Sequence, residues 1–229
     1  MIRLDVEQGS PEWLEVRRGI PTASQFHKLL SPVKLQPSSQ ARGYIAKLCV
    51  EWALGVNQDE DALTQYMRRG SALEARSFAH YELEREVELD HVGFILRDDR
   101  RVGCSPDGLV IGAPGGFEGK TPSAEKHMEY LLDESPTRYA CQVQGGIWLA
   151  EREWWDFQSF NPSLPPLLLR FTRDERFIKA LAEAVDVFLG DLEAAKERLT
   201  KLGVTPTAAP MMAVQAGQDL SAALRDVLA

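Results

Sequence analysis

Two short segments decide the fold: Cys104-Ser105-Pro106-Asp107-Gly108-Leu109 and Phe117-Glu118-Gly119-Lys120. Between them, Gly112-Ala113-Pro114-Gly115-Gly116 has the composition of a turn. The turn predicts two neighbouring strands, so that Asp107 can approach Glu118. Residues two apart on a strand share a face, and Glu118 and Lys120 should therefore point the same way.

Outward from this pair of strands, hydrophobic periodicity and turn residues divide the rest of the chain into elements. A helix over 174–202 should begin at the capping residue Asp174. The sequence predicts further helices over 41–54, 63–86, 124–132 and 137–151, and strands over 87–96, 101–111, 117–121, 153–160 and 167–172. This order favours an α/β (α+β) fold with a central mixed β-sheet flanked by helices.

The length of 229 residues suits one sizeable core with extensions. We expect a single domain over 1–202, made of a basic N-terminal helical part (1–62), a core (63–172) and a C-terminal helix (174–202). Residues 203–229 have the composition of a linker and an amphipathic tail, with an apolar stripe at Leu220, Leu224, Val227 and Leu228. The tail either docks on its own domain or serves a partner.

Composition excludes several classes of protein. With 44% hydrophobic and 26% charged residues, the chain is neither disordered nor fibrous. No apolar run approaches the roughly 20 residues that span a bilayer, and Met1-Ile2-Arg3-Leu4-Asp5 does not begin a signal peptide. The three cysteines form no CxxC pair, so we expect reduced thiols in a cytoplasmic protein without membrane contact.

The charge is unevenly distributed. Residues 1–50 hold seven Lys/Arg and four Asp/Glu, a balance of +3; with a net charge of -8, the other 179 residues carry -11. This asymmetry suits one confined anion-binding surface on an acidic body, although a solvated charged face would give the same count.

The pair of carboxylates indicates metal chemistry. Asp107 and Glu118 would repel each other at close range unless a cation lay between them. Oxygen ligands favour Mg²⁺ or Mn²⁺, and the Gly119 carbonyl can add a further ligand. Lys120 would then point at the attacking water or the scissile phosphate, where its charge stabilises developing negative charge. Alternatively, a Glu/Lys pair on an edge strand is only a surface feature.

Two further polar residues fall on inward faces of predicted helices. Gln144 lies beside the apolar stripe of Ala140, Val143 and Ile147, whereas Gln142 is rotated by about 200° from Ala140 and should point away. Glu74 lies next to Leu73, where an acid is costly unless it is paired. Both are candidate site residues; the alternatives are a satisfied core amide and a glutamate at the rim.

These residues resemble a known family, the phage lambda exonuclease or YqaJ-type viral recombinase branch of the PD-(D/E)xK nucleases. The resemblance rests on five motifs in the order of the family: Trp13 to Ser24 with Arg17, Gly19 and Thr22-Ala23-Ser24; Gly70-Ser71-Ala72-Leu73-Glu74; Ser105-Pro106-Asp107-Gly108; Glu118-Gly119-Lys120; and Gln142-Val143-Gln144. They span about residues 11–172 and leave the tail outside.

The resemblance implies a restriction-endonuclease-like nuclease core and an Mg²⁺-dependent exonuclease, with two metal ions per site. Such an enzyme digests one strand of linear duplex DNA from the 5′ end to mononucleotides and leaves 3′ overhangs for recombination by strand annealing. It also implies a processive homotrimeric ring, a single-strand annealing protein as partner, and a phage or prophage gene.

Carried over residue by residue, the resemblance implies three groups of site residues. Asp107, Glu118 and the Gly119 carbonyl would bind metal. Lys120 would activate the water, and Glu74 and Gln144 would position it. Arg17, Ser24, Ser105 and Trp13 would contact the DNA end or its 5′-phosphate. Lys34 stands where the family has an arginine, which leaves open whether Lys34 or Arg42 completes the phosphate pocket.

Two other functions share part of this evidence. A restriction-like endonuclease or resolvase would use the same metal core but would cut closed circular DNA. A non-catalytic DNA-end-binding recombination scaffold would not need the intact set of Asp107, Glu118 and Lys120.

Overall fold

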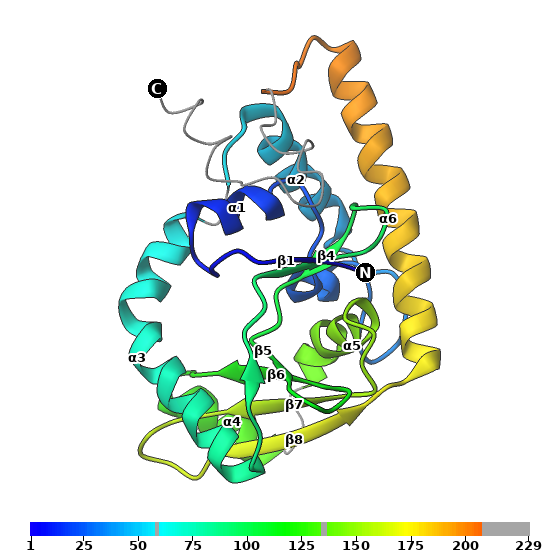
Figure 1. Cartoon of the computed structure of the whole chain (residues 1–229). Helices are drawn as coiled ribbons and strands as arrows, with labels where there is room; N and C mark the ends of the chain where they lie inside the picture. The colour runs from blue at the N-terminus through cyan, green and yellow to red at the C-terminus, as the bar shows by residue number, and fades with distance from the viewer. Residues whose placement is uncertain (58–59, 134–136, 208–229) are drawn as a thin grey trace.

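The strands form two sheets: the three-stranded one lies near the middle of the view, and the five-stranded one lies below it (Figure 1). The computed structural model describes residues 1–57, 60–133 and 137–207, with the segment 60–72 described by its backbone. The five-stranded sheet has the order β2 (Leu89–Asp90), β5 (Gly108–Val110), β6 (Gly115–Lys120), β7 (Trp154–Ser159) and β8 (Leu167–Thr172). Only β6 and β7 run parallel, so the sheet is mixed, as predicted.

The second sheet is antiparallel and has three strands in the order β1 (Ile2–Leu4), β3 (Phe94–Leu96) and β4 (Gly103–Cys104). The sequence analysis missed β1, which is only three residues long. It is a strand because its backbone pairs with β3, more than 90 residues later in the chain.

Helices cover both faces of the large sheet. In chain order the described helices are α1 (Pro11–Arg17), which packs on the three-stranded sheet instead, the 3₁₀ turn η1 (Ala23–Lys28), α2 (Ala41–Leu54), α3 (Glu60–Arg85), α4 (Ala124–Asp133), the 3₁₀ turn η2 (Thr137–Tyr139), α5 (Ala140–Leu149) and α6 (Glu175–Lys201). Figure 1 shows α3 along one side of the molecule and α6 along the other. The arrangement confirms the predicted class, a mixed sheet flanked by helices.

Successive side chains of a strand point to opposite faces of the sheet, so the large sheet has one apolar layer on each face. On one face, Trp155 and Phe157 of β7 are buried with residues of α2, α5 and α6 in the largest core. On the other face, Phe117 of β6 packs with Tyr81 of α3, at 4.1 Å between ring centroids. Glu118, the next residue of β6, therefore faces α5, while Gly119 faces α3.

Several predicted boundaries are correct. Helix α2 and strand β8 match the predicted ranges, and Gly55 ends α2 in a left-handed conformation with φ of 68°. Helix α6 begins after Asp174, whose carboxylate accepts a hydrogen bond from the Phe177 amide at 3.0 Å. Strong local signals, a cap and a glycine stop, explain this agreement.

The two longest predicted strands were wrong in one respect: each breaks in two. Segment 87–96 divides into β2 and β3, and segment 101–111 divides into β4 and β5, because each passes from one sheet to the other. At the first break, a Cβ on Gly93 would lie 2.0 Å from the Val6 carbonyl oxygen. The backbone at Val6 therefore packs directly against the backbone at Gly93, where no side chain would fit.

The turn predicted over 112–116 is shorter than expected, because Gly115 and Gly116 belong to β6. A Cβ at these positions would lie 2.2 Å from the Trp154 ring and 2.3 Å from the Trp155 ring. The two glycines thus make room for tryptophans of the neighbouring strand.

The chain after α6 turns back towards α2, where the Thr207 amide donates to the Ala53 carbonyl at 3.1 Å. The predicted amphipathic tail lies outside the described residues. Among the described helices, none combines the length and the apolar character needed to cross a membrane.

Candidate active site

The two predicted carboxylates meet where β5 and β6 separate. In this antiparallel pair Gly108 stands opposite Phe117, so the next pair of residues would be Asp107 and Glu118. At this point a side chain takes the place of the backbone hydrogen bonds between the strands: Asp107 Oδ2 accepts a hydrogen bond from the Gly119 amide at 2.7 Å. Both acids therefore lie at the open end of the strand pair.

Glu118 is buried, with 3% of its surface exposed, and faces α5. Its Oε1 accepts hydrogen bonds from the Lys120 ammonium, two residues along the same strand, and from Gln142 Nε2 at 2.5 Å. Lys120 also lies 5.7 Å from the centre of the Tyr139 ring. The structure thus brings together an acid, an ammonium group and an amide donor beside Asp107.

Burial changes the acidity of both carboxyl groups. It raises the pKa of Glu118 to about 7; the Lys120 ammonium opposes this shift, and the nearby Asp107 adds to it. Burial also raises the pKa of Asp107, opposed by Lys120, the Gly119 amide and His91. Two acids that resist ionisation side by side are typical of a site that receives a cation.

Gln144 lies inside the protein, as expected, and is the satisfied core amide that the sequence analysis gave as the alternative to a site residue. Its side chain donates to the Thr172 carbonyl at 2.8 Å and accepts from the Asp174 amide at 3.1 Å, so it joins α5 to the start of α6. Gln142, expected to point away, is the glutamine that reaches Glu118. Helix α5 is buried on nearly all sides, so its apolar stripe does not mark a single inward face.

Glu74 lies on α3 and is half-buried. It precedes Phe78 by one helical turn, and the Phe78 ring packs against Phe117 of β6 with 5.6 Å between centroids. Glu74 is therefore on the side of α3 that faces the sheet.

The donor set fits a hard divalent cation. Within the described residues, Asp107 Oδ1 and Glu118 Oε2 accept no hydrogen bond, so one oxygen of each carboxylate is available as a ligand. No group of three or more His, Cys, Asp or Glu side chains gathers as a metal site in the described part of the chain. Two carboxylates with a backbone carbonyl match Mg²⁺, which usually keeps several waters and binds substrate phosphate.

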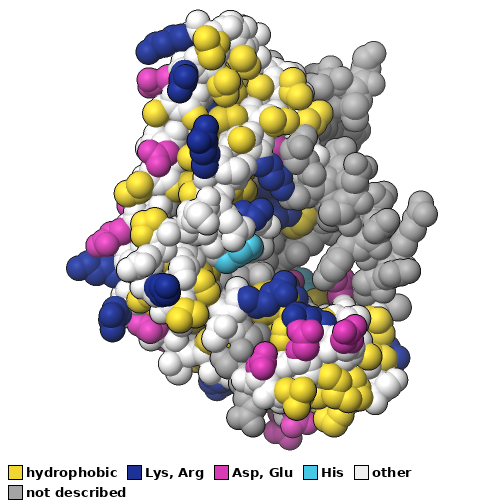
Figure 2. Space-filling view, turned by 180° about the vertical axis from the view of Figure 1, so that it is seen from behind, with side chains coloured by type: hydrophobic (Ala, Val, Ile, Leu, Met, Phe, Trp, Pro, Cys, Tyr) yellow, Lys and Arg dark blue, Asp and Glu magenta, His cyan; other side chains and the backbone are white. Residues whose placement is uncertain are grey.

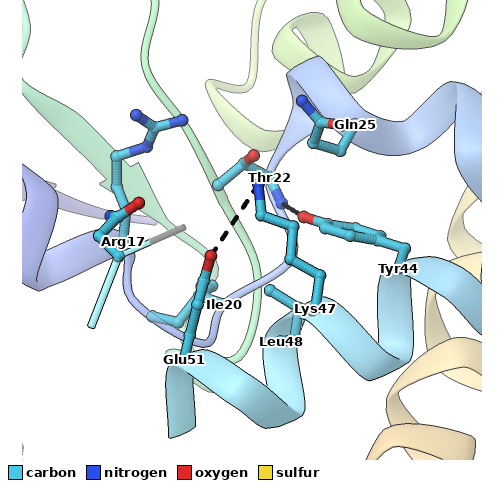
Figure 3. Close-up of a pocket in the computed structure, with 9 residues that line it drawn as sticks. Arg17, Ile20, Thr22, Gln25, Tyr44, Lys47, Leu48 and Glu51 are labelled. Carbon is cyan, nitrogen blue, oxygen red and sulfur yellow. Dashed lines mark hydrogen bonds and ion pairs between the residues drawn. The ribbon is translucent and has the colours of Figure 1, made fainter. Parts of the chain in front are cut away.

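A pocket of about 280 Å³, including space open to solvent, lies between α1 and α2 (Figure 3). Arg17 projects from the end of α1 on one side, and Lys47 rises from α2 on the other (Figure 3). The other lining residues are Ile20, Thr22, Gln25, Tyr44, Leu48, Glu51 and Asn57. The two cations outnumber the one lining carboxylate, Glu51, and stand among uncharged hydrogen-bonding groups, so the pocket is suited to an anion.

Of the residues expected at the 5′-phosphate, Arg17 alone lines this pocket. Ser24 lies next to it, with its hydroxyl 3.2 Å from that of Thr22. Lys34 and Arg42 are exposed and are not among the lining residues, whereas the lining residue Lys47 was missed. Lys47 falls on the same α2 face as Tyr44 and Glu51, and this helical spacing was the available signal.

Trp13 and Ser105 contact each other. Trp13 is 8% exposed, and its Nε1 donates to the Ser105 hydroxyl at 2.9 Å and to the Gly93 carbonyl at 3.1 Å. The Arg17 guanidinium lies 3.7 Å above the Trp13 ring. The structure therefore places Trp13 inside the protein, beneath Arg17, rather than on an open surface.

Comparisons with known proteins agree on one family. A model of the YqaJ-like viral recombinase domain matches residues 12–153. The alkaline exonuclease LHK-Exo from Laribacter hongkongensis is 30% identical, with a TM-score of 0.74, and the match covers 85% of this chain and 98% of that one. Its complex with dAMP gives the same identity and coverage, with a TM-score of 0.75.

A phage related exonuclease from Haemophilus somnus shares the fold at 16% identity, with a TM-score of 0.62, over 80% of this chain and 96% of that one. No curated protein sequence matches the chain.

Proposed function

The chain belongs to the family of YqaJ-like viral recombinase domains, and from this membership we propose that it is an Mg²⁺-dependent exonuclease of linear duplex DNA. One observation carries the proposal: Asp107, Glu118, Lys120 and Gln142 converge at the open end of β5 and β6. The related alkaline exonuclease, solved with dAMP, supports a mononucleotide as product.

Each of these residues has a role in hydrolysis. Asp107, Glu118 and the Gly119 carbonyl would hold Mg²⁺, or Mn²⁺ in its place, and the family resemblance implies two ions per site. The bound cation supplies positive charge against the charge that develops on the phosphate. Lys120 orients the attacking water and stabilises the hydroxide that forms when the water loses a proton. The new bond joins this oxygen to phosphorus, the bond to the 3′-oxygen breaks, and the 3′-oxygen leaves as a hydroxyl by taking up a proton from solvent, which replaces the proton that the attacking water gave up.

Gln142 and Glu74 have supporting roles. Gln142 donates to Glu118 and so fixes the rotamer of a metal ligand. Glu74 faces the sheet from α3 and helps to position the water. Gln144, by contrast, maintains the packing of α5 against α6.

The pocket between α1 and α2 supports digestion from the 5′ end. Arg17 and Lys47, with Ser24 beside them, bind the 5′-phosphate of the strand being shortened, and Lys47 takes the place expected for Lys34. A site that holds a 5′-phosphate and cleaves one nucleotide away releases 5′-mononucleotides and leaves a 3′ overhang.

Such overhangs are substrates for strand annealing, so a single-strand annealing protein is the partner that fits this product. A homotrimeric ring around the DNA would keep the enzyme on its substrate between cleavages. The family also fits a protein that is encoded by a phage or prophage and acts in the cytoplasm of a bacterial host.

The test is a gel assay of linear duplex DNA labelled at either the 5′ or the 3′ end. With Mg²⁺, the 5′ label should leave as a mononucleotide while the 3′ label stays in long products, and EDTA should stop both. Closed circular plasmid is the control, because a restriction-like endonuclease or resolvase would cut it.

Lys120→Ala should lower the rate of hydrolysis on the order of 10²–10⁴-fold, while DNA binding persists. Full activity in that variant would remove the role of Lys120, and binding without any cleavage by the wild type would favour a DNA-end-binding scaffold.

A further inference from the structure

Two contacts connect the anion pocket to the loop that carries Asp107. The Arg17 guanidinium lies 3.7 Å above the Trp13 ring. The Trp13 indole N–H reaches the Ser105 hydroxyl at 2.9 Å. Ser105 precedes Asp107 by two residues. The path from the pocket to the carboxylate thus passes through a single side chain, that of Trp13.

The loop over 105–107 depends on such contacts because it lies between β4 and β5, outside either sheet. The N-terminal segment holds it at two points. Gln8 Nε2 donates to the Pro106 carbonyl at 2.7 Å and to the Val92 carbonyl at 2.8 Å. Trp13 makes the parallel pair of contacts, to Ser105 and to Gly93. The two side chains tie this loop to the break between β2 and β3.

We propose that Trp13 is a positioning residue that couples the 5′-phosphate pocket to the metal carboxylate Asp107. This inference rests on the proposed function, since it takes Arg17 as a phosphate ligand and Asp107 as a metal ligand. The ring face of Trp13 supports the Arg17 guanidinium through a cation–π contact. Its N–H fixes Ser105 and, through the backbone of residues 105–107, the position of Asp107.

The two halves of the indole can be separated by substitution. Trp13→Phe keeps a ring beneath Arg17 and removes the N–H. Trp13→Leu removes both. Ser105→Ala removes the hydroxyl that accepts from Trp13 and leaves the Trp13 contact with Gly93 in place. Trp148→Phe is the matched control, because this tryptophan also lies beneath an arginine, Arg97, at 5.8 Å.

The experiment measures binding without hydrolysis. Mn²⁺ affinity is read from the loss of the free-ion signal in electron paramagnetic resonance. The preference for 5′-phosphorylated over 5′-hydroxyl duplex is read from fluorescence anisotropy in EDTA. Trp13→Phe should weaken Mn²⁺ binding about tenfold and leave the end preference unchanged. Trp13→Leu should also lower the end preference, by roughly threefold to tenfold. Ser105→Ala should weaken Mn²⁺ binding in the same direction, and Trp148→Phe should change neither quantity.

Unchanged Mn²⁺ affinity in both Trp13→Phe and Ser105→Ala would overturn the proposal, as would a Trp13→Phe protein that loses both quantities together. Circular dichroism reports whether each variant folds, and if Trp13→Phe does not fold, Ser105→Ala decides the outcome. A wild-type protein that digests no DNA would remove the proposed function without affecting the result for Trp13.

Discussion

At the level of single residues, two glutamines of α5 have different tasks although they are two positions apart. Gln142 donates to a carboxylate at the candidate active site, and Gln144 bonds the backbone on both sides of the junction between β8 and α6. Both side chains satisfy buried or partly buried polar groups, so composition alone does not separate them.

Substitution by leucine should separate the two roles. Gln142→Leu removes a donor to a metal ligand, so turnover should fall on the order of 10–100-fold with little change in melting temperature. Gln144→Leu leaves the Thr172 carbonyl and the Asp174 amide unpaired, which should cost about 1–3 kcal/mol of unfolding free energy and lower the melting temperature. Steady-state kinetics and thermal melts on both variants make the comparison; the reverse pattern would return the catalytic role to Gln144.

The acidity of Glu118 should control metal affinity. Its pKa is about 7 in the folded protein, raised by burial above the ordinary 4.5. In metal-free protein, this group therefore contributes stability that is complete below about pH 4.5 and is lost as the pH rises through 7. A divalent cation needs the ionised form, so its stabilising effect should grow over the same range.

Thermal melts with and without Mn²⁺ at about pH 6 and about pH 8 provide the measurement, and the Mn²⁺-induced rise in melting temperature should be larger at the higher pH. The control is Glu118→Gln, which has no carboxyl group to titrate at this position and should show a small rise with a weaker dependence on pH. An equal rise at both pH values in the wild type would contradict the prediction.

At the level of elements, α1 and α2 build the pocket by presenting one cation each across a gap (Figure 3). Arg17 is near the end of α1, and Lys47 is one turn before Glu51, whose carboxylate lies 4.0 Å from the Lys47 ammonium and accepts from the Gly19 amide at 2.8 Å. Glu51 thus connects Lys47 to the turn that follows α1, and the two helices are held at a fixed separation.

The rate preference for 5′-phosphorylated ends should depend on these two helices rather than on the turn that carries Lys34. Arg17→Ala and Lys47→Ala should each lower the ratio of kcat/KM for phosphorylated over hydroxyl ends by about tenfold or more, since each removes a charge-assisted hydrogen bond. Lys34→Ala should leave the ratio near the wild-type value. A larger loss in Lys34→Ala than in Lys47→Ala would move the phosphate site towards the position that the family resemblance gives.

At the level of the whole molecule, charge is mixed over the surface. On the face shown in Figure 2, Lys and Arg side chains gather near the middle as well as at the edges, with acidic and apolar side chains among them. The net charge of -8 by itself would suggest an acidic surface, but this face carries basic side chains as well. Association with DNA through a local basic region should weaken with salt.

Among the residues that the structure describes, the candidate site and the pocket draw on those before 203, and the chain after α6 packs against the end of α2 through Thr207. Removing residues 211–229 should therefore leave exonuclease activity and the oligomeric state unchanged. Digestion assays and sedimentation analysis of the full-length and shortened proteins test this expectation. Loss of solubility or of assembly would instead indicate that the tail docks on its own domain.

The sequence by itself determined most of the elements and singled out the two acids, Asp107 and Glu118, that meet at the candidate active site. Caps, glycine stops and strand alternation act within a few residues, so α2, β8, α6 and the shared face of Glu118 and Lys120 follow from local patterns. The tertiary structure alone decided which glutamine reaches Glu118, which lysine lines the pocket, and where two predicted strands break. These features depend on contacts between segments far apart in the chain, such as Trp13 with Ser105 or Gly93 with Val6, and hydrophobic periodicity carries no information about such contacts.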